Sequence, residues 1–461
     1  MRKVISYVCM LFLIGLSCSL DQLSASEHGS FFIKSPLHHR DIGELQQSTA
    51  KYAGKSNYTP DLTTYWEKKS MQTFAGKSHM THFIWEGSRP PYGQWDKIIL
   101  HRLIKRSTWN ERDRNKVILL LPGTWNAAGW SDLIDTSINT IYYLANQGYD
   151  VYTLSFRNGA IPNLEYEQFP EYGFDVSQTL DWTYGLYRED IKACIEKIKR
   201  LSKTRKVFLA GFSRGVQLAF IYASKYQNDL KGLVALDGPV KKYPPNTDEA
   251  VDQESFNFVI YLLQNGLLPV PDDCDGILCP PAGTNYQLLN EATWEHYNSW
   301  QLAAVVPFAM TLAGSELPAE FFTISSFIAD NGYSMWGDGV FSNYYGGNIN
   351  EEVLVTAMSE FTRFWPTIQD FEQWQLEAYD DVPYFDYDDN QVNLPLIAFL
   401  SPLFCPNASC TDPSIPNLTI HPDVTINYLS AYGHIDIMFG NNSMTDIKEP
   451  LLNWLNSHLH Y

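Results

Sequence analysis

A serine between two glycines is the first feature of this sequence that could do covalent chemistry. The segment Gly211-Phe212-Ser213-Arg214-Gly215 follows the apolar run Lys206–Ala210 and opens a helical pattern that extends to Tyr226. A sharp strand-to-helix turn needs small residues two positions before and after the serine, because larger side chains would collide with the neighbouring strand and helix. Such a turn lifts the hydroxyl above a sheet, so Ser213 is the candidate nucleophile. An ordinary glycine-rich turn is the alternative interpretation.

A nucleophilic serine also requires N–H donors for the oxyanion that forms on its substrate. The backbone N–H of Arg214, directly after the serine, is the first candidate. The second should follow an earlier strand, and Leu121-Pro122-Gly123-Thr124-Trp125 follows the apolar run 116–121. We expect Thr124 to supply this second N–H, with a simple Pro-Gly turn as the alternative.

The base that would activate the serine is expected late in the chain. His434 lies in Ser430-Ala431-Tyr432-Gly433-His434-Ile435-Asp436, directly after the last predicted strand, 424–429. A histidine in a loop at this place can take the hydroxyl proton and return it to the leaving group. Asp436 is expected to support this loop or cap a turn.

The acid that orients the histidine has two candidates. Asp237 follows the predicted strand 231–236 in Ala235-Leu236-Asp237-Gly238-Pro239 and is favoured; its alternative role is that of a turn residue. Asp412 lies beyond a later strand, 395–400, whose continuation Ser401-Pro402-Leu403-Phe404 carries no carboxylate. Asp412 is therefore the alternative acid, and a water or neutral partner is a third solution.

Strand and helix patterns alternate around these residues, which predicts a mostly parallel sheet with helices on both faces. An early hairpin is expected at 81–86 and 97–104. The later strands and helices are predicted, in chain order, at 116–121, 138–147, 150–156, 178–202, 206–210, 214–226, 231–236, 394–400, 424–429 and 446–459.

The alternation stops between residues 241 and 392, which predicts a large, mainly helical insertion between two strands of the sheet. Its apolar run 303–312 and its many aromatic residues could line a pocket for an acyl chain or an aryl group. The same residues could instead build the insertion's own core. The acidic run 380–389 is expected to be a solvated loop, because the spacing of a calcium-binding EF-hand is missing.

The order of the elements, Gly211–Gly215 and Tyr432–Asp436 resemble the α/β-hydrolase superfamily. Within it, residues 182–195, the serine turn and the histidine segment look like acid lipases and related secreted bacterial or archaeal hydrolases. The likeness covers roughly 115–240 and 393–461. It implies an α/β-hydrolase fold with a cap insertion, a Ser–His–acid triad and hydrolysis of an ester. Pro122 departs from the family, because lipases commonly carry a histidine before the oxyanion glycine.

The start of the chain predicts secretion. Arg2 and Lys3 precede an apolar run, 4–16, and small residues near Ala25 follow, which is the layout of a signal peptide. A lipoprotein anchor at Cys18 is the alternative. We therefore expect a signal peptide at 1–25, an extension without clear periodicity at 26–80, hydrolase core at 81–240 and 393–461, and the cap at 241–392.

Seven cysteines fit a secreted protein. Two pairs, Cys274 with Cys279 and Cys405 with Cys410, lie in loop-like segments and are expected to form disulfides. A zinc site is the competing interpretation, although the spacings match no common finger. Cys194 falls on the apolar stripe of a predicted helix, where a buried free thiol is expected.

Composition limits the classes of function that remain. The chain has 461 residues, 45% of them hydrophobic, and a net charge of −19. Such an acidic chain lacks the basic surface of a nucleic-acid-binding protein. The leading hypothesis is a serine hydrolase that needs no cofactor and acts on a small-molecule ester or lipid. An acyltransferase or peptidase with the same triad, and a non-catalytic binding module on the same fold, are the alternatives.

Overall fold

A nine-stranded sheet forms the centre of the computed structural model. Its strands follow the order β1-β2-β3-β5-β4-β6-β7-β8-β9. The structure describes residues 64–74, 77–108, 113–123, 139–160, 182–238, 369, 372, 392–401, 419–430, 432, 436–440 and 442–461.

The sheet has an antiparallel part and a parallel part. The first three strands pair antiparallel with one another, and β3 pairs antiparallel with β5. All pairs from β5 through β4 to β9 are parallel. The strands are β1 (Tyr65–Phe74), β2 (Lys77–Ser88), β3 (Lys97–Lys105), β4 (Val117–Leu121), β5 (Asp150–Ser155), β6 (Val207–Phe212), β7 (Leu230–Leu236), β8 (Leu396–Leu400) and β9 (Val424–Tyr428).

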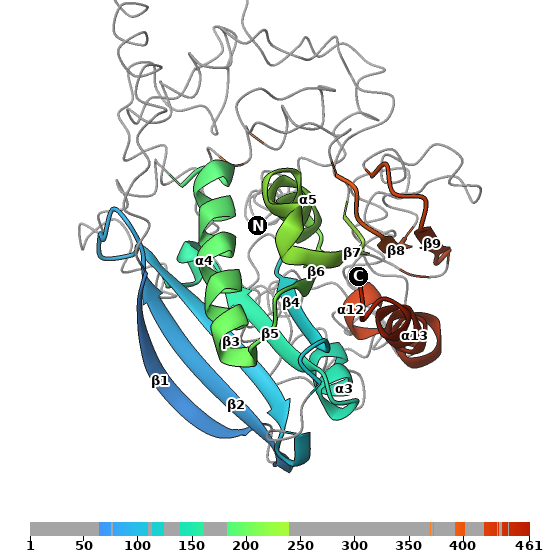
Figure 1. The fold of residues 1–461 in the computed structure, drawn as a ribbon, viewed down its shortest axis with the longest axis horizontal. Helices are drawn as coiled ribbons and strands as arrows, with labels where there is room; N and C mark the ends of the chain where they lie inside the picture. The colour runs from blue at the N-terminus through green and yellow to red at the C-terminus, as the bar shows by residue number, and fades with distance from the viewer. Residues whose placement is uncertain are drawn as a thin grey trace, which may run out of the picture.

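Helices cover both faces of the parallel part. Figure 1 shows α4 (Tyr184–Ser202) and α5 (Arg214–Tyr226) next to each other on one side of the sheet. The other face packs against α3 (Thr140–Asn146), α12 (Asp436–Phe439) and α13 (Glu449–Ser457). This arrangement confirms the predicted α/β class with a mostly parallel sheet between two helical layers.

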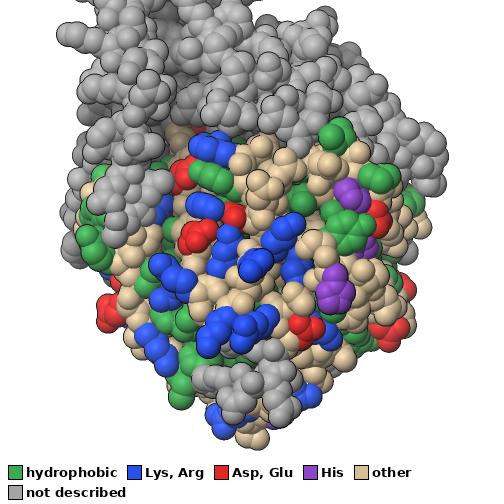
Figure 2. All heavy atoms as spheres, viewed as in Figure 1, with side chains coloured by type: hydrophobic (Ala, Val, Ile, Leu, Met, Phe, Trp, Pro, Cys, Tyr) green, Lys and Arg blue, Asp and Glu red, His purple; other side chains and the backbone are tan. Residues whose placement is uncertain are grey.

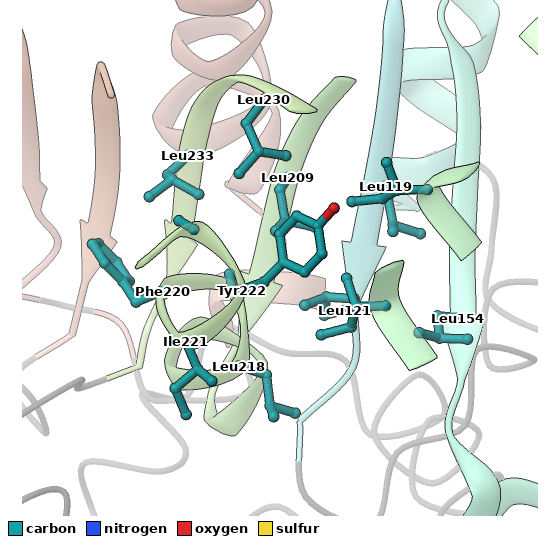
Figure 3. Packing of buried hydrophobic residues seen from close by; sticks show 14 of the residues in the cluster. Leu119, Leu121, Leu154, Leu209, Leu218, Phe220, Ile221, Tyr222, Leu230 and Leu233 are labelled. Atoms are coloured by element: carbon teal, nitrogen blue, oxygen red, sulfur yellow. The ribbon is translucent and has the colours of Figure 1, made fainter. Parts of the chain in front are cut away.

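Each face of the sheet has its own hydrophobic core, because successive strand residues point to opposite sides. In β4, Leu119 and Leu121 belong to the core under α4 and α5, whereas Ile118 and Leu120 belong to the core on the other face. Figure 3 shows side chains of α5, including Tyr222, packing among leucines of β4, β6 and β7. All five residues of β4 are buried, as expected for a strand covered on both faces.

The insertion occupies the predicted place in the topology. Strands β7 and β8 are parallel neighbours in the sheet, yet about 160 residues of sequence separate them. The chain therefore leaves the sheet after β7 and returns one strand further along. The predicted helical character of the cap, its aromatic pocket and the acidic run lie outside the described residues.

Three predicted boundaries were wrong. Tyr65–Phe74, assigned by the sequence to an extension, forms the edge strand β1. Helix α4 begins at Tyr184 rather than near 178, because the Thr183 side chain accepts a hydrogen bond from the N–H of Leu186 and caps it. The last predicted helix is a π-helical turn, Met444–Lys448, followed by α13.

A buried network of two arginines and two aspartates ties the antiparallel strands to α4. Asp190 accepts hydrogen bonds from Arg157 at 2.7 and 2.9 Å and from Arg89 at 2.7 Å. Arg157 also donates to Asp96, which accepts from Trp182 as well. All four charged side chains are at most 1% exposed, and these carboxylates raise the pKa of Arg157. The two charges of each sign balance inside the protein.

The surface over α4 carries positive charge although the chain as a whole is acidic. Figure 2 shows lysine and arginine side chains gathered on this face. Two lysines of α4 are neutralised locally, since Lys192 and Lys199 both pair with Asp229, at 2.6 and 2.5 Å. The charge of the whole chain therefore does not describe each face.

Several predictions about the chain's ends and cysteines concern residues beyond the described ranges. The signal peptide, the anchor at Cys18 and both expected disulfides belong to this group. Cys194 is described: it is a free, buried thiol, as predicted, and burial raises its pKa well above the ordinary value. Among helices in the described ranges, none combines the length and apolar character needed to cross a bilayer.

The buried network gives a prediction about stability. Asp190→Asn removes the anion shared by two buried guanidinium groups, so we expect a loss of about 3–5 kcal/mol in the free energy of unfolding. Urea denaturation followed by circular dichroism measures this loss. The control is Glu196→Gln, whose exposed carboxylate pairs with Lys192 and Lys199 and should contribute at most about 1 kcal/mol. Equal losses of unfolding free energy in the two variants would contradict a large contribution of the buried network to stability.

Candidate active site

Ser213 stands on a sharp turn between β6 and α5. Its backbone adopts φ 54° and ψ −127°, a conformation that costs a non-glycine residue energy. Two hydrogen bonds hold it there: its N–H donates to Leu236 O at 3.0 Å, and its carbonyl accepts from the N–H of Val216 at 2.9 Å. Although Ser213 occupies the N-cap position of α5, its side chain makes no capping hydrogen bond. The half-buried hydroxyl is therefore not used to cap the helix that it precedes.

Glycines make this turn sterically feasible, because side chains at these positions would collide with neighbouring backbone. A Cβ on Gly211 would lie 2.2 Å from Gly215 O in the first turn of α5. A Cβ on Gly215 would lie 2.6 Å from Leu121 O, at the end of β4. Gly238 shows the same constraint, since its Cβ would lie 2.1 Å from Ser213 O. Backbone segments from β4, β6 and the end of β7 thus meet at the serine turn.

One of the two predicted oxyanion donors, the N–H of Arg214, belongs to a residue at this meeting point. Arg214 follows the serine as the first residue of α5, and its side chain is buried. The end of β4 packs against the same helical turn, as the close approach of Leu121 and Pro122 to Gly215 shows. Thr124, two residues further, lies outside the described residues, so its N–H remains a prediction.

Asp237 directly follows β7, the strand next to β6. It is fully buried and has a positive φ of 47°, so the chain turns sharply at this residue. Its N–H donates to Phe399 O at 2.9 Å, and both of its carboxylate oxygens accept hydrogen bonds from Ser401. The Ser401 N–H donates at 2.6 Å and its hydroxyl at 2.7 Å. The carboxylate is thus held at the same sheet edge as the serine turn.

The sheet order places Asp237 between the serine turn and the predicted histidine loop. Parallel strands β6, β7, β8 and β9 are successive neighbours, and the loop with His434 follows β9. His434 and the alternative acid Asp412 lie outside the described residues. The structure therefore brings Ser213, Arg214 and Asp237 to one edge, while the contact between acid and histidine stays a prediction.

Ser401 is a site residue that the sequence analysis did not identify. It directly follows β8, and the sequence shows there only the lack of a carboxylate. A signal was nevertheless present, because a small hydroxyl residue at the end of a buried strand can donate both its N–H and its side chain to a neighbouring acid. These two hydrogen bonds fix the orientation of the Asp237 carboxylate independently of any contact with a histidine.

Metal ligation was the competing interpretation of the cysteine pairs, and those pairs lie outside the described residues. In the part of the chain that the structure describes, no three His, Cys, Asp or Glu side chains gather in a manner suited to a metal ion. His82 and His101 form a pair whose ring nitrogens lie 3.0 Å apart.

Comparison with known proteins agrees with this geometry. A family model for the alpha/beta hydrolase fold matches residues 116–262, which include β4, the serine turn and β7. The chain has the α/β-hydrolase fold. No curated protein matches its sequence.

Solved structures resemble this chain over most of its length. A lipase candidate from Sulfolobus solfataricus has a TM-score of 0.58 and 22% identity, covering 85% of this chain and 99% of its own. A carboxyl esterase from Bacillus coagulans has a TM-score of 0.42 and 12% identity, with 86% and 100% covered. A monoacylglycerol lipase from Paleococcus ferrophilus has a TM-score of 0.38 and 13% identity, with 75% and 96% covered. The first of these structures supports the fold.

The position of Asp237 generates a prediction about the acid. Asp237→Asn should lower kcat/KM on an activated ester by about a hundredfold or more, because a neutral amide cannot stabilise the imidazolium. Folding should change little, since Asn can still accept one bond from Ser401. Asp412→Asn is the matched control and should cost much less. The assignment would be wrong if the Asp412 variant suffered the larger loss.

Proposed function

We propose that this α/β-hydrolase is a secreted serine hydrolase that cleaves a carboxylic ester through an acyl-enzyme intermediate. The observation that carries the proposal is the Ser213 turn. The Ser213 hydroxyl does not cap α5, and the turn lies at the sheet edge where Ser401 holds Asp237. A strained serine backbone between close-packed glycines has no evident structural advantage over glycine at that position. A chemical role for the hydroxyl accounts for a serine at this position.

The proposed reaction has two steps. His434 removes the Ser213 proton as the oxygen attacks the ester carbonyl, and the N–H groups of Arg214 and Thr124 stabilise the resulting oxyanion. The oxyanion collapses, the C–O bond to the alcohol breaks, and the imidazolium protonates the departing alcohol. Water, deprotonated by the same histidine, then releases the carboxylic acid and restores Ser213. Asp237 would accept the second ring N–H of His434 and stabilise its charge.

The substrate is proposed to carry an apolar acyl chain or an aryl group. The support lies in the sequence of the insertion, which leaves the sheet directly after Asp237 and contains the apolar run 303–312. The resemblance to a lipase candidate is compatible with this class. Secretion is proposed from the signal-like start of the chain.

The proposal predicts strong cooperation between nucleophile and base. Ser213→Ala and His434→Ala should each lower kcat on a p-nitrophenyl ester by at least about a thousandfold, because the two residues act as one unit. The double variant should be little worse than either single variant. Steady-state kinetics on the three folded variants measures these losses, and additive losses would show that the residues act separately.

Labelling by a fluorophosphonate provides a second measurement that needs no knowledge of the natural ester. The wild-type chain should be labelled and Ser213→Ala should not. Failure to label folded wild-type protein would exclude an activated serine and favour a non-catalytic binding module. Transfer of the acyl group to an added amine or alcohol, in preference to water, would favour the acyltransferase alternative.

A further inference from the structure

The end of helix α4 and the turn after it are strongly basic, although the net charge of the chain is −19. Residues 197–206 contain six lysine and arginine residues and no acidic residue. The segment belongs to the face over α4 on which basic side chains gather in Figure 2. Of the six, Lys199 pairs with Asp229 at 2.5 Å. The other five have no acidic partner in the part of the chain that the structure describes and are called the basic patch here: Lys197, Arg200, Lys203, Arg205 and Lys206.

Lys197 is held against the protein next to a second positive charge. Its Nζ lies 5.5 Å from the centre of the Trp66 ring and 5.8 Å from that of Trp85, and both rings attract the ammonium group. Burial and the charge of Arg200 lower the pKa of Lys197. Arg200 lies three positions later, on the same side of the helix, where two like charges are destabilising. The fold therefore keeps these two cations close together without an acid between them.

The energetics of helix α4 do not account for the whole patch. The helix dipole favours cations in the last turn, which explains Lys199 and Arg200. Lys203, Arg205 and Lys206 follow the helix. Lys203 has a left-handed backbone with φ 54°, a conformation that glycine adopts at lower cost. Solubility does not explain these residues either, because each added cation brings the net charge of −19 closer to zero.

The basic patch lies at the opposite edge of the sheet from the serine turn. Strand β6 begins at Val207, directly after the patch, and ends at Phe212, directly before Ser213. The strand spans about 20 Å between these two edges. A partner bound to the patch would therefore not occupy the edge at which Ser213 lies.

The chemistry of the patch favours a hydrophilic polyanion as its partner. None of the large apolar side chains that are exposed among the described residues belongs to 197–206. Surfaces that bind anionic bilayers combine cations with such apolar side chains, which enter the boundary of the acyl region. A nucleic-acid duplex carries one charge per about 1.7 Å, and the acidic remainder of the chain would repel it. A polysaccharide with one carboxylate per sugar has a lower charge density and meets less repulsion.

We propose that the basic patch binds an acidic polysaccharide, whose carboxylate groups pair with Arg200, Lys203 and Arg205. These three side chains are exposed, so binding requires no rearrangement of the fold. The planar guanidinium group of each arginine can take a carboxylate through two parallel hydrogen bonds. Lys197 and Lys206, which are half-buried, add positive potential at the same place. The inference does not depend on the reaction at Ser213.

Binding to fluorescently labelled polygalacturonate tests the proposal, with labelled dextran as the neutral polymer. Fluorescence anisotropy at about 50 mM salt should show saturable binding of the wild-type chain to polygalacturonate and none to dextran. At about 200 mM salt the Kd should rise at least about fivefold, because salt screens attraction between exposed charges. Lack of binding to polygalacturonate at the lower salt concentration would overturn the proposal.

Two matched charge reversals test the location. Lys203→Glu reverses one exposed charge of the patch and should raise the Kd for polygalacturonate at least about fivefold. Lys225→Glu makes the same change at an exposed lysine in the last turn of α5, outside the patch, and should change the Kd by less than about twofold. If Lys203→Glu did not fold, as judged by circular dichroism, Arg205→Glu would take its place with the same expected loss.

The remaining outcomes concern the partner and the site. Equal losses in Lys203→Glu and Lys225→Glu would show that the attraction is spread over the surface, and would overturn the assignment to the basic patch. Tighter binding to vesicles of anionic phospholipid, or to a DNA duplex, than to polygalacturonate would overturn the choice of partner. Fluorophosphonate labelling of Ser213 tests the proposed function separately, and none of these binding results would alter it.

Discussion

The close approach of α5 to the ends of β4 and β6 is the constraint on which the rest of the site depends. Three chain segments meet at distances that leave no room for a Cβ on Gly211, Gly215 or Gly238. Only a tight turn satisfies this packing, and Ser213 takes the positive φ that the turn requires. Such a conformation costs of order 1–3 kcal/mol, and the hydrophobic cores on both faces of the sheet offset that cost. Stability generated by the whole domain thus maintains one strained residue.

The same packing places the acid. Because β7 lies beside β6, the residue after β7 emerges next to the serine turn, and a Cβ on Gly238 would lie 2.1 Å from Ser213 O. Asp237 is then fixed from the other side by Ser401 at the end of β8. The insertion lies between β7 and β8 in the sequence. The segment proposed to contact substrate therefore follows the strand that precedes Asp237 and precedes the strand that leads to Ser401. Glu372, a residue of the inserted segment, accepts a hydrogen bond from the N–H of Tyr184 at the start of α4.

Local sequence patterns predicted the central strands and helices well. They could not predict contacts between residues that are far apart in the sequence. Helix α5 has the predicted bounds because its apolar periodicity and the preceding glycine turn agree. The role of Ser401 depends on a residue 164 positions away, and the Arg89–Asp190 bond spans 101 positions, so no local pattern shows either contact. Strand β1 was missed because it is mostly exposed and carries a register shift between Lys68 and Ser70, which breaks the alternation expected of a strand.

The central claim is that Ser213 becomes covalently acylated. Rapid mixing of the wild-type chain with p-nitrophenyl acetate, acid quenching and peptide mass spectrometry test it most directly. The account predicts a burst of p-nitrophenol close to one equivalent per chain, and an acetyl group on the peptide that contains Ser213. Acetylation at another residue, or turnover with neither a burst nor an adduct at Ser213 under any quenching time, would contradict the account.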